Sequence, residues 1–337
     1  MEKEWLEERF QGDDDHNKKN GDENNDDDDH DSLFSIDSND TLHNFIEFQS
    51  HRNSTGLEEA ISFSYPFQES MVPCEDTDVE ANVNNADDDA DGIIRKRTMI
   101  STLLEEDDLV PIFDGAGWAG TRVWAAAIWG IKYLVEEYGN LSVDQKHGNG
   151  NEHGKKMTLC ELGCGLGVPG MIWHQLGGDV VLTEQEKIMS QLRDNVKSNF
   201  KDSYVSLSSN SSEEGQKETS SREGATICAH PLDWSREGYQ ELLNTTGFRN
   251  GFDIVLNCDC VYEPLYGKSW ELLVDVIDEC LKTNPKCCVV TSVERRSADG
   301  IDDFVEKMKS SEFVGNVEKV LEDKPRKLEL YITSGIR

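Results

Sequence analysis

The chain has 337 residues, and its 67 acidic and 33 basic side chains give a formal net charge of −34. The charge is uneven, because residues 1–94 carry 28 acidic and 5 basic side chains whereas residues 95–337 carry 39 and 28. A chain this acidic, with no basic stripe, is a poor candidate for binding nucleic acid or an anionic membrane surface. We therefore expect neither as a partner.

Short sequence features exclude further classes. The longest apolar run, residues 123–131, is about half the length of a membrane-spanning helix. The acidic N-terminus lacks the apolar core of a secretory signal. The nine cysteines lie mostly in apolar runs and include no Cys-x-x-Cys pair. We expect reduced, buried thiols, no metal site, and a location in the cytoplasm, with the nucleus as a second compartment.

The first 94 residues have an unusual composition. Runs of acids at 13–15, 26–29 and 87–91 stand among Asn, Ser and His. Such a segment cannot bury enough apolar surface to offset the entropy lost on ordering, so we predict that residues 1–94 are largely disordered. Two apolar patches, 42–48 and 61–67, are candidate short binding elements, with chance patches in a linker as the alternative.

From residue 95 to the end, strand-like and helix-like stretches alternate. This pattern predicts an α/β domain with a doubly wound, mostly parallel Rossmann-like sheet and a C-terminal β-hairpin, interrupted by a polar, solvated insertion at 206–222. The predicted strands are 157–162, 179–183, 225–231, 252–258 and 286–293, the hairpin strands are 314–320 and 328–332, and the helices are 121–137, 168–176, 188–200, 238–244, 269–282 and 302–310.

The strongest motif is Glu161-Leu-Gly-Cys-Gly-Leu-Gly167, where the first parallel strand meets a helix. Glycines allow the backbone to pass close to a ligand at the carboxyl end of a strand. The spacing differs from the Gly-x-Gly-x-x-Gly of dinucleotide binders, and the acid would repel a pyrophosphate but suits a cationic ligand such as S-adenosylmethionine. A turn whose glycines serve only packing is the alternative. The candidate cofactor residues here are Glu161, Gly163, Cys164, Gly165 and Gly167.

Three further positions are candidates for the same ligand. Glu184 ends the second strand, 21 positions after Gly163, where an acid accepts hydrogen bonds from ribose hydroxyls. Asp233 and Trp234 follow the third strand, where an indole packs on adenine and a carboxylate meets its amino group. Trp124 could line the same pocket. The alternatives are a solvated cap for Glu184 and core or loop-anchoring roles for the two tryptophans.

The fourth strand ends in Asn257-Cys-Asp-Cys-Val-Tyr262, at the edge that faces the reactive end of a ligand. There Asp259 could hold an incoming ammonium group and help remove its proton, with Tyr262 shaping the pocket. A capping Asp and a core Tyr are the alternative. His174 and His230 are interpreted as structural, and no Ser or Cys stands in a nucleophile-elbow sequence.

In their order and spacing these motifs resemble the seven-stranded, S-adenosylmethionine-dependent methyltransferase family 16, over roughly residues 100–335. That family includes many protein-lysine methyltransferases and proteins once labelled nicotinamide N-methyltransferase-like. The resemblance implies a class I methyltransferase fold with strand order 3-2-1-4-5-7-6. It is carried by 121–127, 159–170, 231–234 and 253–262 together with Asn195 and Asn199.

The same resemblance implies roles for individual residues. Cofactor contacts would come from Trp124, 163–165, Glu184, Trp234 and Cys258, with Asp259 and Tyr262 at the substrate edge. The sequence departs from the family pattern at two places. Cys258 stands where Ala is usual, and Glu184 is followed by Gln-Glu, where an Asp is commoner.

We therefore expect an S-adenosylmethionine-dependent N-methyltransferase that acts on a lysine of a protein substrate, and we expect a monomer. One alternative is methylation of a small amine or heterocycle. The other is a cofactor-binding scaffold without transfer activity, which would use its acidic N-terminal segment to recruit basic partners.

Overall fold

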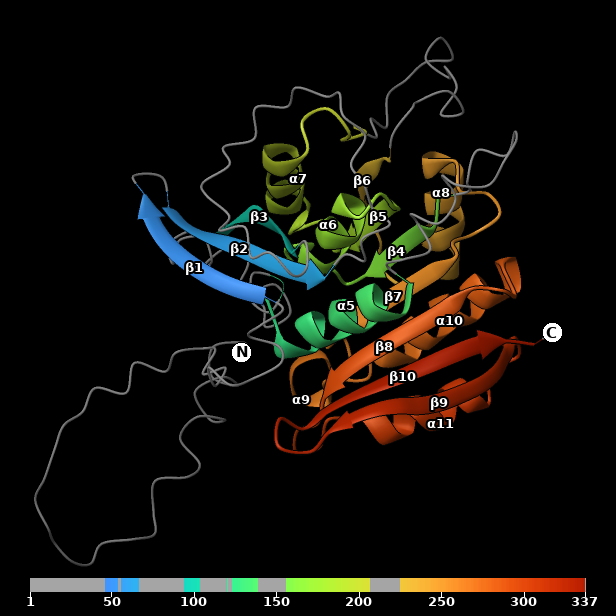
Figure 1. Ribbon diagram of the computed structural model, residues 1–337. Coiled ribbons are helices and arrows are strands. Elements are labelled where there is room, and N and C mark those ends of the chain that lie inside the picture. The colour runs from blue at the N-terminus through green and yellow to red at the C-terminus, as the bar shows by residue number, and fades with distance from the viewer. Residues whose placement is uncertain are drawn as a thin grey trace, which may run out of the picture. The chain divides into compact units, whose positions relative to one another are not determined.

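The structure is a computed structural model (Figure 1), in which residues 46–53, 56–66, 94–103, 120, 123–138, 156–206 and 225–336 are described. The predicted insertion lies outside these residues except for Ser206. None of the helices in these ranges is long and apolar enough to cross a membrane.

Within the described residues, seven strands form one sheet in the order β6-β5-β4-β7-β8-β10-β9. The first five are mutually parallel, and β10 runs antiparallel to both β8 and β9. Numbered along the chain, this order is 3-2-1-4-5-7-6, so the predicted doubly wound sheet with its C-terminal hairpin is confirmed. The bounds are β4 Thr158–Leu162, β5 Asp179–Glu184, β6 Ile227–Pro231, β7 Ile254–Cys258, β8 Cys288–Glu294, β9 Val314–Asp323 and β10 Leu328–Gly335.

Helices cover both faces of this sheet (Figure 1). On one face α8, α10 and α11 share a continuous apolar core with the strands, because their buried side chains recur at helical spacing. On the other face lie α5, α6 and α7. The bounds are α5 Ala125–Tyr138, α6 Val168–Gln175, α7 Met189–Asn199, α8 Arg236–Thr246, α9 Glu263–Tyr266, α10 Trp270–Thr283 and α11 Ile301–Lys309.

Two helical details differ from the prediction. The helix expected over 121–137 begins at Ala125, which leaves Val123 and Trp124 before its first turn. The short helix α9 was not predicted, because four residues that include Pro264 are too few to show a helical period.

The N-terminal part of the described chain holds a separate antiparallel sheet in the order β1-β2-β3, with β1 at Ile46–Asn53, β2 at Gly56–Pro66 and β3 at Ile94–Leu103. β1 and β2 fall within residues 1–94, and these two strands were not predicted from the sequence. Composition averaged over 94 residues hid the strand-like alternation of 61–65, which is Ile-Ser-Phe-Ser-Tyr. The rest of that segment lies outside the described residues, and the domain boundary stays a prediction.

The start of the central strand is tied to its neighbour by side chains. Asp253, just before β7, accepts hydrogen bonds through Oδ2 from the backbone N–H and the hydroxyl of Thr158, both at 3.0 Å. Its own N–H donates to the Thr158 hydroxyl at 2.9 Å. Asp179 and Thr226 tie β5 to β6 in a similar way, at 2.7 and 2.8 Å. These pairs reinforce the register that aligns the carboxyl ends of the parallel strands.

We predict that Asp253→Ala lowers the free energy of unfolding by about 1–3 kcal/mol, because it leaves the donors of Thr158 without this acceptor. Urea denaturation measures the change. The exposed Asp194, replaced by Ala, is the control and should change stability by no more than about 0.5 kcal/mol. Equal effects of the two substitutions would contradict the role of this pair.

Candidate cofactor and substrate site

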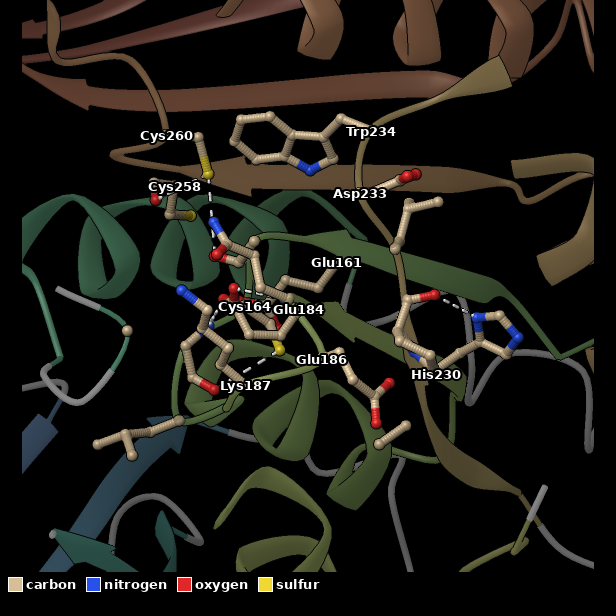
Figure 2. Close-up of a pocket in the computed structure, with 18 of the residues that line it drawn as sticks. Glu161, Cys164, Glu184, Glu186, Lys187, His230, Asp233, Trp234, Cys258 and Cys260 are labelled. Carbon is tan, nitrogen blue, oxygen red and sulfur yellow. Dashed lines mark hydrogen bonds between the residues drawn. The ribbon is translucent and has the colours of Figure 1, made fainter. Parts of the chain in front are cut away.

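A cavity of about 1640 Å³ lies at the carboxyl ends of the parallel strands. Figure 2 shows Glu161, Glu184 and Trp234, which come from three different strands or the turns after them, around this cavity. Most of the residues predicted from the sequence line it together. They are Trp124, Glu161, Gly163, Cys164, Gly165, Glu184, Asp233, Trp234, Cys258 and Asp259.

The glycine turn after β4 follows a path that needs glycine. Gly163 and Gly165 have φ values of 63° and 53°, in the left-handed region. A Cβ atom on Gly163 would lie 2.8 Å from the Cys260 sulfur and 3.1 Å from the ring of Trp234. A Cβ atom on Gly165 would lie 2.9 Å from the carbonyl oxygen of Gly120. The turn is therefore a close-fitting cradle on the cavity side.

Gly167, in contrast, does not line the cavity. A Cβ atom there would lie 2.8 Å from Leu182 and 2.9 Å from Leu192, so this glycine allows α6 to pack against β5 and α7. The packing alternative weighed for the whole motif thus describes Gly167, whereas Gly163 and Gly165 also line the cavity.

Glu184 joins the second strand to the glycine turn. Its side chain is buried, Oε2 accepts a hydrogen bond from the Gly165 N–H at 2.9 Å, and Oε1 accepts one from the Gln185 N–H at 2.8 Å. Burial raises the pKa of this carboxyl. Each carboxylate oxygen has two acceptor positions, so Glu184 retains capacity for the two hydroxyls of a ribose.

Glu161 is the most deeply buried acid at the cavity, with 2% of its surface exposed. Burial raises the pKa of its carboxyl to about 8, although the hydrogen bond from the Gly170 N–H at 2.8 Å acts in the opposite direction. A buried acid of this kind is stabilised in its ionised form by a cationic ligand. The buried carboxyl groups of Glu161 and Glu184 fit the positively charged ammonium and sulfonium of S-adenosylmethionine.

Asp233 and Trp234 form the turn after β6. Asp233 accepts hydrogen bonds through Oδ1 from the hydroxyl and the N–H of Ser235, at 2.7 and 3.2 Å, while Ser235 caps α8. Trp234 has a φ of 56° and places its ring against Gly163 at the cavity. The indole is thus positioned to cover a planar group held by the turn.

The cysteines and histidines fit structural roles. Burial raises the pKa of the Cys164, Cys258 and Cys260 thiols, so they are protonated and weakly nucleophilic. His174 has hydrogen-bond partners at both ring nitrogens, the Gly178 carbonyl and the Ser203 hydroxyl. No group of three or more His, Cys, Asp or Glu side chains in the described ranges could hold a metal ion.

At the end of β7, the structure adds a residue that the sequence did not single out. The Arg296 guanidinium forms two hydrogen bonds with the Asp259 carboxylate, of 3.0 and 2.6 Å. Tyr262 does not line the cavity but contacts Arg296, with 5.2 Å between the guanidinium carbon and the ring centroid. Arg296 follows the fifth predicted strand, which neighbours the fourth strand in the sheet. This position was the one signal in the sequence that could have placed Arg296 near Asp259.

The strand order, the glycine turn after the central strand and the acid at the end of the next strand together define a class I methyltransferase. Residues 106–311, more than half of the chain, match the lysine methyltransferase family, and the chain belongs to this family. S-adenosylmethionine is the cofactor of such enzymes.

The chain is similar to several curated proteins, including the following three. The secreted RxLR effector protein 48 of Plasmopara viticola is 39% identical over 41% of this chain and 64% of its own length. The protein-lysine N-methyltransferase EFM2 of Saccharomyces cerevisiae is 22% identical over 52% and 36%. The EEF1A lysine methyltransferase 3 of Xenopus tropicalis is 26% identical over 62% and 72%. The chain thus spans less than two thirds of the length of the first two.

Among solved structures, the 16S rRNA N2 G1207 methyltransferase of T. thermophilus is similar over 72% of this chain and 48% of its own, with 12% identity and a TM-score of 0.44. A likeness this distant says nothing about the substrate.

We predict that Gly163→Ala weakens binding of S-adenosylhomocysteine at least about tenfold, because the added methyl group meets Cys260 and Trp234 and distorts the cradle. Isothermal titration calorimetry measures the affinity. Gly177→Ala is a matched control, since Gly177 also has a positive φ of 97° but no atom within 4 Å of the added Cβ. Gly177→Ala should leave the affinity unchanged. If both substitutions weakened binding equally, the loss in Gly163→Ala would not come from contacts at the cavity.

The raised pKa of Glu161 makes a prediction for stability. Glu161 stays protonated in the folded chain up to about pH 8 but ionises near pH 4.3 when unfolded. Unfolding between these values releases a proton, so rising pH favours the unfolded state across this window. From pH 5.5 to pH 8 the free energy of unfolding of the wild type should fall by a few kcal/mol more than that of Glu161→Gln, as measured by urea denaturation at each pH.

Glu186→Gln is the control for Glu161, because Glu186 lines the same cavity but is exposed. The pH dependence of this variant should match the wild type. If the stability of Glu161→Gln showed the same pH dependence as that of the wild type, Glu161 would not be the acid that causes this pH dependence.

Proposed function

We propose that the chain transfers the methyl group of S-adenosylmethionine to the side-chain amine of a lysine in a protein substrate. The observation that carries this proposal is the position of Asp259, which lines the same cavity as the glycine turn. Two of the similar proteins are named as lysine methyltransferases, which supports lysine as the acceptor.

The cofactor-binding roles follow from the contacts in the cavity. Glu161 would hold the ammonium of the cofactor, Glu184 the ribose hydroxyls and Trp234 the adenine, while Gly163 and Gly165 allow close approach of the backbone. When bound, the cofactor supplies a methyl group on a sulfonium: the carbon–nitrogen bond forms as the carbon–sulfur bond breaks, its electron pair stays on sulfur, and the amine proton leaves to solvent.

The residues near β7 would position the acceptor amine. Holding the amine and the methyl group in line supplies several kcal/mol by proximity. The lysine must arrive without its proton although its free pKa is about 10.4; desolvation lowers that pKa and a nearby carboxylate raises it. Asp259 therefore acts mainly by positioning the amine, and Trp124 forms a wall of the same cavity.

The acidic composition of residues 1–94 supports a second part of the proposal. Its field would attract basic, lysine-bearing partners, and improved solubility is the simpler effect of the same charge. Location in the cytoplasm and a monomeric state belong to this proposal as well.

We predict that the purified chain, incubated with cell lysate and cofactor carrying a tritiated methyl group, labels discrete protein bands whose modified residue is lysine by mass spectrometry. Gly163→Arg is the control and should give no label, because the large side chain fills the cradle. Asp259→Ala should retain cofactor binding but lose at least about tenfold in turnover. Label confined to small molecules would favour the small-amine alternative, and no label at all would favour the scaffold.

A further inference from the structure

The pair formed by Asp259 and Arg296 is the most enclosed charge pair of the described site. Only 4% of the Asp259 side chain and 21% of the Arg296 side chain are exposed. Asp259 Oδ1 accepts hydrogen bonds from Arg296 Nη1 at 3.0 Å and from the Glu294 N–H at 3.3 Å, and Oδ2 accepts one from Arg296 Nη2 at 2.6 Å. This bidentate geometry fixes the plane of the carboxylate.

Arg296 is itself held on several sides. Its guanidinium carbon lies 5.4 Å from the ring centroid of Trp124 and 5.2 Å from that of Tyr262. Nη2 also donates to the Glu294 carboxylate at 2.7 Å, and the backbone N–H of Arg296 donates to Asp299 at 3.0 Å. A surface arginine that only solubilises the protein would not need these restraints.

The charges of this group bear on the lysine that must react. A lone buried carboxylate at the position of Asp259 would stabilise the ammonium form of an arriving lysine, which cannot attack a methyl group. The guanidinium offsets that charge at the point where the amine arrives, whereas the Glu294 carboxylate, bonded to the same Nη2 as Asp259, restores part of it. Burial lowers the pKa of Arg296, but Asp259 and Glu294 more than offset this and raise it, so Arg296 stays charged.

Other ionisable groups also face the pair. Burial keeps the Cys258 and Cys260 thiols and the Tyr266 hydroxyl neutral, and their raised pKa values reflect it. Since these three groups are neutral, the charges that act on the amine are those of the carboxylates and of Arg296. Among the described residues, the titratable groups that act on Asp259 or Arg296 are Cys258, Cys260, Tyr262, Tyr266, Glu294 and Asp299. Glu161 and Glu184 act on the Cys260 thiol of this group.

We propose that Arg296 is a positioning residue that neutralises Asp259, so that Asp259 can orient the substrate amine by hydrogen bonding without holding it in its protonated form. This inference rests on the proposed methyl transfer to an amine. The proton lost by the amine passes to solvent before the carbon–nitrogen bond forms, and the methyl transfer itself is unchanged.

Two substitutions should move the pH profile in opposite directions. Arg296→Gln removes the neutralising charge beside the bound amine, so the pH at which kcat reaches half its plateau should rise by about one unit. Glu294→Gln removes the second carboxylate bonded to Arg296, so the same midpoint should fall. Because the Glu294 side chain is 32% exposed, we expect Glu294→Gln to fold. This variant still tests the inference if Arg296→Gln does not fold.

The probe is the purified protein whose lysine is labelled in the lysate experiment, and the measurement is kcat at saturating substrate from pH 6 to pH 10. Arg296→Lys should restore most of the wild-type midpoint because it keeps the charge. The affinity for S-adenosylhomocysteine, measured for each variant, should match the wild type.

Reduced activity with an unmoved midpoint in both variants would overturn the inference and leave Arg296 a structural residue. A lower KM for Arg296→Gln would also overturn it, because Arg296 would then occupy the place of the amine. If the wild-type chain labels no protein lysine, the proposed function fails first and the inference fails with it; if it labels lysine and only the midpoint is unmoved, the inference alone is wrong.

Discussion

The hydrogen bond from the Gly165 N–H to Glu184 is the constraint on which the rest of the site depends. It joins the turn after the central strand to the end of the neighbouring strand, at 2.9 Å. The left-handed glycines allow the chain to make this approach, and at Gly163 and Gly165 no Cβ atom narrows the cavity. Because β4 lies between β5 and β7, the same turn places Glu184 on one side of the cavity and Asp259 on the other.

The acids of the cavity differ in how their charge is balanced. Glu161 and Glu184 are buried and accept hydrogen bonds from backbone N–H groups, and burial raises the pKa of both carboxyls. Asp259, in contrast, has a full bidentate partner in Arg296. Under the proposed function, the first two would hold a cationic ligand, whereas the third would be neutralised where the uncharged amine reacts.

The overall charge of the chain bears little on this chemistry. Most of the net charge belongs to residues 1–94, and the site is made by a few buried groups beyond residue 120. A long-range field affects encounters with basic partners, while the reaction depends on hydrogen bonds and charges a few ångströms apart.

The sequence by itself determined the order of strands and helices, the glycine turn and the acid at Glu184, because these features are local patterns of period and spacing. The strand order was predicted through resemblance and confirmed by the sheet. Only the tertiary structure decided that Gly167 serves packing, that Tyr262 faces Arg296 and not the cavity, and that Arg296 pairs with Asp259 from 37 positions away. Such contacts depend on which strand ends become neighbours and on where side chains point, and no spacing along the chain encodes either.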